Sequence, residues 1–223
     1  MQKPEFPLGA MVSAAWRVFS DHFMLLFFGH LLINLILSSG PGVIVAGPLW
    51  YGLSAVALLA LRGLPTTIDD LFSGFRSFLP TLVVGLLMIA LISGGCLLLA
   101  IPFVLATLLA WSTQSVPLIV MTFSVGMTLS LLPICAVLFF YAPTFFILFD
   151  GETDAIRAMK ASHLMVWNNS GQWLNVWVAL SLLHVAGLLL CCAGIYLVTP
   201  WMVVVLAMAY ERERQAVEQA KTG

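Results

Sequence analysis

Two histidines lie inside long apolar stretches, where an imidazole ring could do chemistry. His30 falls near the middle of one expected membrane span and His184 near the middle of another, and Asn34 follows His30 by one helical turn. Two histidines at similar depth on different helices could ligate haem or a pigment. Neutral histidines that hydrogen-bond between helices are the more common case. We therefore expect no cofactor and no metal site, and keep haem or pigment binding through His30 and His184 as a minor alternative.

The four cysteines are the next candidates. Cys96, Cys135, Cys191 and Cys192 lack the paired Cys-x-x-Cys spacing of a metal site. Cys191 and Cys192 are adjacent at an expected outer turn, and Cys96 is expected near the same face, so a disulfide is one alternative. Packing as small side chains within helices is the other. The sequence leaves open whether any cysteines pair.

No arrangement typical of a catalytic site is present. Ser93 and His184 could be imagined as an intramembrane serine protease pair, but the motif that usually surrounds such a serine is missing. A catalytic nucleophile also needs an adjacent base that is itself oriented by a third group. We predict that the chain is not an enzyme and has no catalytic residues.

The composition indicates that membrane helices position these residues. Hydrophobic residues make up 61% of the 223 residues and charged residues 9%, and the mean hydropathy is +1.06. A soluble domain is about 45–50% apolar and about 25% charged. Soluble, disordered and disulfide-scaffold classes are therefore excluded. A net charge of -1 provides no basic surface for nucleic acid, so the lipid bilayer is the partner that we expect.

The distribution of charge predicts the topology. All charges fall in four segments, each with two or three Lys or Arg residues: 1–21, 62–76, 150–160 and 211–223. The positive-inside rule assigns all four segments to the cytoplasm, which requires an even number of crossings between successive segments. We expect a multi-pass protein of the cell inner (plasma) membrane with six spans and both termini cytoplasmic.

The charge-free stretches accommodate these spans as helices, because helices satisfy their own backbone in lipid. The expected spans are 23–38, 43–61, 79–110, 117–149, 171–191 and 195–210. They form one all-α integral membrane domain, 1–223, made of three hairpin units: 1–61, 62–149 and 150–223. The polar run 111–115 is interpreted as an outer turn. A separate span over 102–121, giving seven crossings, is the alternative for the undecided stretch 100–123.

Each hairpin is preceded by a segment with one apolar helical face, at 8–19, 66–78 and 153–167. Thr67 and Asp70 have the spacing of a capping box. Such helices lie in the membrane interface, or they pack on the protein's own spans. The aromatic residues that we expect at the membrane interface are Trp16, Phe19, Phe72, Phe75, Trp167 and Trp173.

Several short motifs carry a family resemblance. They are the run 70–76, then 141–143 and 149–152, and finally Thr199-Pro200 and Ala209-Tyr210. In this order the chain resembles uncharacterised bacterial six-span integral membrane proteins, which are similar to the membrane domain attached to some glycerophosphoryl diester phosphodiesterases. The resemblance covers most of the chain, although 100–130 is longer than the family pattern. It implies a six-span fold, and the phosphodiesterase activity is not carried over, because this sequence shows no soluble phosphodiesterase domain.

Two classes of function remain open. One is a scaffold or accessory subunit of a larger membrane assembly, whose partners are other protein subunits. The other is a lipid-handling or small-solute transport protein. Ion-coupled transporters usually need charged residues inside their spans, and the expected spans contain none. Passive movement of lipid needs no such group. A stoichiometric protein partner would favour the scaffold, and a specifically bound lipid the second class.

Overall fold

The computed structural model describes residues 7–189 and 193–222, and every regular element in that part of the chain is helical. It confirms the all-α fold class. Among the described residues, five helical stretches are long and apolar enough to cross a membrane, and the bent pair α1 (Leu8–Asp21) and α2 (Phe23–Leu37) makes a sixth if it counts as one span. The chain is thus a multi-pass membrane protein.

The first hairpin is bent at its beginning. α1 and α2 meet at 87°. α2 has 15 residues, whereas a membrane span needs about 20. The expected span over 23–38 is therefore too short by itself, and reaches the length of a span only together with α1. The returning arm is as expected, and consists of η1 (Pro41–Val45) and α3 (Ala46–Leu61).

The second unit is a long hairpin. Its elements are α5 (Phe78–Ser112), α6 (Val116–Leu129), α7 (Leu131–Tyr141) and α8 (Thr144–Phe149). The chain reverses at residues 113–115, where Gln114 has a φ of 56°. The expected turn is confirmed, and the alternative span over 102–121 is wrong because the reversal falls inside it. The breaks in the returning side of this hairpin fall at Ser130, one turn before Pro133, and at residues 142–143, which include Pro143. A proline lacks the N–H that would bond to the carbonyl one turn earlier.

The third unit begins with α9 (Ala155–Asn168) and continues with α10 (Ser170–Leu189) and α11 (Ala193–Thr222). Asp154 caps α9 by accepting a hydrogen bond from the backbone N–H of Arg157. α11 runs well past residue 210, where its expected span ends. Arg214 forms ion pairs with Glu211 and Glu218, one turn away on either side, and such pairs support a helix in its charged part.

The segment 66–78 differs most from expectation. It forms only the short α4 (Ile68–Leu71) and η2 (Ser73–Phe75), although Thr67 and Asp70 do form the capping box. The reason is close backbone contact with α3. A Cβ on Gly52 would collide with the backbone of Leu71, and a Cβ on Gly74 with the backbone of Pro48. The segment therefore lies against the middle and first turn of α3, and the prediction of a continuous amphipathic helix is wrong.

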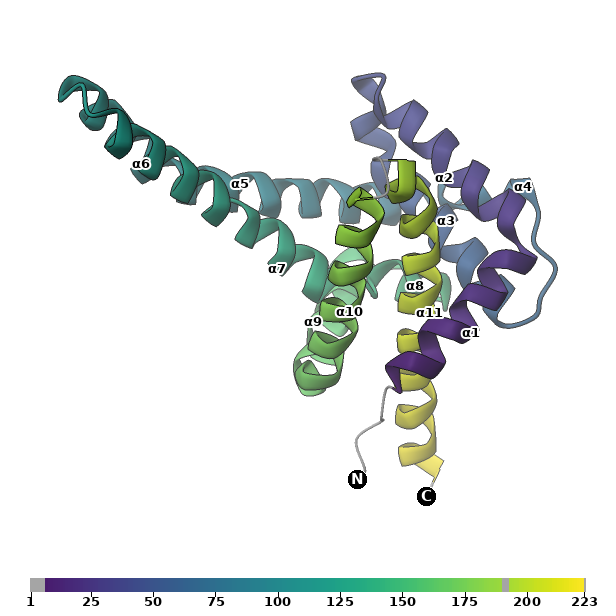
Figure 1. The fold of residues 1–223 in the computed structure, drawn as a ribbon. Helices are drawn as coiled ribbons and strands as arrows, with labels where there is room; N and C mark the ends of the chain where they lie inside the picture. The colour runs from purple at the N-terminus through teal and green to yellow at the C-terminus, as the bar shows by residue number, and fades with distance from the viewer. Residues whose placement is uncertain (1–6, 190–192, 223) are drawn as a thin grey trace.

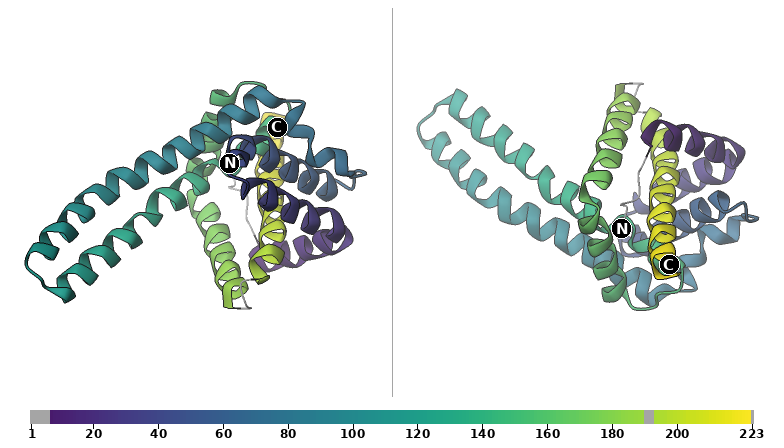
Figure 2. Two further views of the ribbon diagram at one scale, coloured as in Figure 1. Left: turned by 90° about the horizontal axis from the view of Figure 1, so that it is seen from above. Right: turned by 90° about the horizontal axis from the view of Figure 1, so that it is seen from below.

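The molecule consists of a packed body and a projecting arm (Figures 1 and 2). In the body, α11 lies between α10, α3 and α1. The largest fully buried side chains include Met11 and Phe19 of α1, Leu53 of α3 and Trp173 of α10, and α11 contributes smaller buried residues such as Val204 and Ala207. α5 and α6 extend together away from the body. The most apolar part of α5 is only 11% buried, compared with 67% for α3.

Candidate functional site

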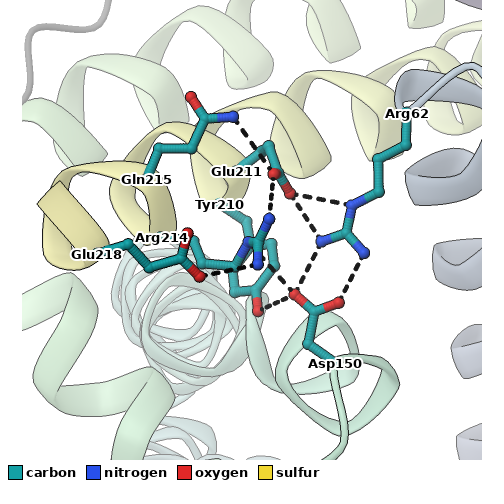
Figure 3. A network of polar contacts seen from close by, with 7 residues as sticks. All are labelled: Arg62, Asp150, Tyr210, Glu211, Arg214, Gln215 and Glu218. Carbon is teal, nitrogen blue, oxygen red and sulfur yellow. Dashed lines mark hydrogen bonds and ion pairs between the residues drawn. The ribbon is translucent and has the colours of Figure 1, made fainter.

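Five side chains from three span ends meet in one network, which we call the polar cluster (Figure 3). Its members are Arg62, Asp150, Tyr210, Glu211 and Arg214. Arg62 directly follows α3, Asp150 directly follows α8, and the other three lie on α11. The cluster therefore joins helices from all three hairpin units.

Arg62 is the central donor of the polar cluster. Its Nη1 and Nη2 atoms donate to the two carboxylate oxygens of Asp150 at 2.7 and 2.8 Å. Nη2 and Nε also donate to Oε2 of Glu211, at 2.8 and 3.2 Å. A guanidinium fork suits this arrangement, because its planar N–H groups match the two oxygens of a carboxylate.

The α11 side chains complete the coordination of the carboxylates. The Tyr210 hydroxyl donates to Oδ2 of Asp150 at 2.8 Å. Arg214 Nη2 donates to Oε1 of Glu211 at 2.7 Å, and its Nε lies 3.6 Å from Oδ2 of Asp150. Each of these two carboxylates thus faces both arginines, and Arg214 also pairs with the more exposed Glu218 at 3.0 Å.

Burial and hydrogen bonding act in opposite directions on Asp150. Partial burial raises the pKa of its carboxyl. Hydrogen bonds from Arg62 and Tyr210 and the charges of both arginines together lower it by more than burial raises it, so the pKa is below its ordinary value. The hydrogen bonds that Arg62 donates to Asp150 and to Glu211 raise the pKa of Arg62. At neutral pH all of these charges persist, so the cluster is suited to holding helix ends together.

The polar cluster was not among the site residues expected from the sequence. A usable signal was present, because Arg62, Asp150 and Glu211 are each the first charged residue after a long apolar stretch.

α1 also begins close to the cluster. A hollow of about 320 Å³ is lined by Met11 and Ala14 together with Arg62, Glu211 and Arg212.

The two span histidines have separate protein neighbours. His30 is buried beside the rings of Trp50 and Tyr196, and Nδ2 of Asn34 lies 3.0 Å from its Nε2. His184 has its Nδ1 3.3 Å from the sulfur of Met202. Tyr196 and Met202 are about 9 Å apart along α11, and joint ligation by the two histidines stays a prediction. The described residues contain no group of three or more potential metal ligands.

The six interfacial aromatic residues divide into two groups. Trp16, Phe72, Phe75 and Trp167 are exposed on the surface of the protein, and their position in a membrane interface stays a prediction. Phe19 and Trp173 are fully buried within the protein, so their rings contact its own helices, and their depth in the membrane also stays a prediction. The apolar face of α1, which includes Met11 and Phe19, packs on the protein's own helices, the second of the two alternatives.

The cysteines that the structure describes are both free thiols. Cys96 donates a hydrogen bond from its Sγ to the carbonyl of Ser130 across the hairpin, and Cys135 is exposed. Cys191 and Cys192 lie outside the described residues. The pairing of Cys96 with either of them stays an open prediction.

A large apolar surface belongs to residues 93–133, which we call the hairpin arm. The two helices of the arm are joined by a hydrogen bond between the hydroxyls of Thr107 and Thr122 at 3.0 Å. Gly126 packs directly against Phe103. On the outside, Ser93 and Gly94 are exposed among apolar neighbours. The arm is therefore a preformed helix pair whose outer surface contacts no other described element along most of its length.

A cavity of about 600 Å³ opens at the bend between α1 and α2. Ser20, Asp21 and His22 line one part of it, together with Thr66 and Thr67 from the segment before α4. Its apolar part is lined by the following side chains of α2 and α4: Phe23, Met24, Leu25, Phe28, Leu32, Ile68 and Leu71. A polar and an apolar wall in one opening suit an amphiphilic molecule.

Comparison with known proteins assigns no relative. No protein-family model matches the chain, and neither a search of curated proteins nor a search of solved structures finds a match.

Proposed function

We propose that this multi-pass membrane protein is a non-catalytic scaffold, an accessory subunit that presents its hairpin arm to other membrane subunits. The observation that carries the proposal is the exposure of the arm. α5 has 35 residues, about 52 Å, and little of its apolar surface is covered by the rest of the chain. Small residues such as Ser93 and Gly94 on its surface allow another helix to approach closely.

The anchoring of the arm supports this role. At its base, Thr81, Val84 and Gly85 of α5 are buried, and a Cβ on Gly85 would collide with the backbone of Gly47 on α3. The polar cluster ties the C-terminal ends of α3 and α8 to the charged part of α11. A fixed base and a free apolar arm are what a subunit that organises other spans requires.

The finer assignments are also part of the proposal. We place the protein in a bacterial inner membrane with both termini in the cytoplasm, and in the group of six-span proteins that its motifs resemble. The support is the Lys and Arg content of the four charged segments.

Site-specific photo-crosslinking in native membranes tests the scaffold. A photoreactive residue at Leu105, which is 56% exposed on the arm, should give a discrete adduct with another protein, whereas one at Leu182, which is 66% exposed on α10, should not. A variant without residues 101–112 and 116–127 keeps the turn and the base, and should fold but lose the partner on purification. Adducts with lipid alone at Leu105 would contradict the scaffold.

Lipid handling is the second candidate function. It is favoured by the amphipathic cavity at the α1–α2 bend. If the arm crosslinks only to lipid while a lipid copurifies in stoichiometric amount, this function replaces the scaffold.

A further inference from the structure

We propose that the cavity at the α1–α2 bend binds an aminophospholipid, a lipid whose headgroup ends in a primary ammonium group. The proposal does not depend on the scaffold function, because the cavity and the hairpin arm share no residue. Its volume of about 600 Å³ lies within the range of small-molecule sites, and admits a headgroup together with the first part of an acyl chain.

The charge of the cavity selects a cationic group. Asp21 lines it, and none of the described residues that line it is Lys or Arg. Within the described part of the chain, Asp21 also forms no ion pair. An anionic headgroup would place a second negative charge beside this carboxylate, whereas an ammonium group would neutralise it.

The neighbours of Asp21 add hydrogen-bond acceptors. His22 Nδ1 lies 3.1 Å from the carbonyl of Val18, so in the neutral ring this nitrogen carries the proton and Nε2 is an acceptor. The Ser20 hydroxyl donates to the carbonyl of Trp16 at 2.8 Å, which leaves its lone pairs as acceptors. Ser20, Asp21 and His22 thus each bring an acceptor to the wall of the cavity, and a primary ammonium has three N–H donors to use. A choline headgroup has no N–H and cannot use them.

The remaining walls suit the rest of a lipid. Thr66 also lines the cavity, and a threonine hydroxyl can donate to a phosphate oxygen. Phe28 and Leu32, which are 53% and 38% exposed, continue from the polar part along α2. An acyl chain along these side chains would cover apolar surface that the protein itself leaves uncovered.

Native mass spectrometry of the full-length protein tests the site. The purified protein is titrated separately with phosphatidylethanolamine, phosphatidylcholine and phosphatidylglycerol of identical acyl chains. We expect the ethanolamine lipid to bind most tightly. Asp21→Asn should weaken its binding about tenfold, the size of one lost charged hydrogen bond, and Asp21→Glu should retain most of it.

Asp69→Asn is the matched control. Asp69 is an exposed carboxylate on the neighbouring α4 and does not line the cavity, so its substitution should leave all three affinities unchanged. Circular dichroism verifies that each variant is folded. Equal affinity for the three lipids, or unchanged ethanolamine-lipid binding by folded Asp21→Asn, would overturn the proposal. Neither result bears on crosslinking by the hairpin arm.

Discussion

Arg62 is a single residue on which the contacts among three hairpin units depend. It donates to both Asp150 and Glu211, whose own helices are far apart in the sequence. Because the side chains of the polar cluster are only partly exposed, removal of one member leaves the opposite charges short of partners in a poorly solvated place. The cost of such a loss exceeds that of breaking an exposed ion pair.

Asp150→Asn should therefore destabilise the protein clearly. The substitution keeps the size of the side chain but removes the charge that both arginines face, and we expect the free energy of unfolding to fall by about 2–3 kcal/mol. Unfolding in mixed micelles with increasing SDS measures it. Glu152→Gln, which breaks the exposed pair with Arg157, is the control and should cost less than about 1 kcal/mol. Equal losses would mean that the polar cluster contributes no more than a surface pair.

The contribution of Asp150 should depend on pH in a defined direction. Its pKa in the folded protein is below the ordinary value of 3.8, so the folded state favours the ionised form. The stabilisation is complete above the ordinary pKa, and is lost as the pH falls below about 4 through the lowered folded value. The difference in unfolding free energy between wild type and Asp150→Asn should thus be constant from pH 7 to 5 and smaller at pH 3. A difference that grows toward pH 3 would contradict this sign.

At the scale of elements, glycines determine how closely the two sides of the hairpin arm approach. Gly94 and Gly95 are adjacent in α5, but only Gly95 faces α7, where a Cβ on Gly95 would lie 2.7 Å from the side chain of Pro133. A Cβ on Gly94 meets nothing within 4 Å. The two positions form a natural pair for separating helix propensity from packing.

Gly95→Leu should separate the helices of the arm, and Gly94→Leu should not. Both substitutions remove a helical glycine and improve helix propensity by about 1 kcal/mol, so their difference reports packing alone. We expect a lower thermal unfolding midpoint for Gly95→Leu, together with a longer distance between spin labels at residues 108 and 118. If both variants behave alike, the two helices of the arm are not in close contact at Gly95 and Pro133.

Hydropathy predicted most elements because it depends only on local composition. The expected spans near α3, α5, α10 and the stretch 117–149 are confirmed within a few residues. The prediction of a continuous helix over 66–78 was wrong because the helical spacing of its apolar residues identifies one apolar face only. That spacing gives no information about the close backbone contact with Gly52 and Pro48. The same limit applies to Phe19, since an apolar face packs equally well on lipid or on a neighbouring helix.

The candidate sites were less predictable than the elements for a related reason. Arg62, Asp150 and Glu211 are separated by long stretches of sequence, and only the tertiary arrangement brings them together. The sequence instead drew attention to His30 and His184, which the structure gives separate neighbours. The amphipathic cavity also depends on a bend at His22, which no proline or glycine marks.

At the scale of the whole molecule, the polar cluster bears on topology. Direct ion pairs from Arg62 to Asp150 and Glu211 require these three chain positions to lie at one end of the body. Reporter fusions after residues 68, 160 and 220 should therefore report the same side of the membrane, and a fusion after residue 112 the opposite side. Opposite reports from 68 and 160 would contradict an even number of crossings between them.

The length of α5 has a consequence for the surrounding bilayer. Its 35 residues extend about 52 Å, about 20 Å more than the hydrocarbon thickness of a bilayer. Such a helix must tilt strongly, bend at Pro102 or thicken the adjacent lipid, and each accommodation changes when acyl chains lengthen. Hydrophobic mismatch thus couples the inclination of α5 to lipid chain length, and a subunit packed along it would be reoriented as membrane thickness varies.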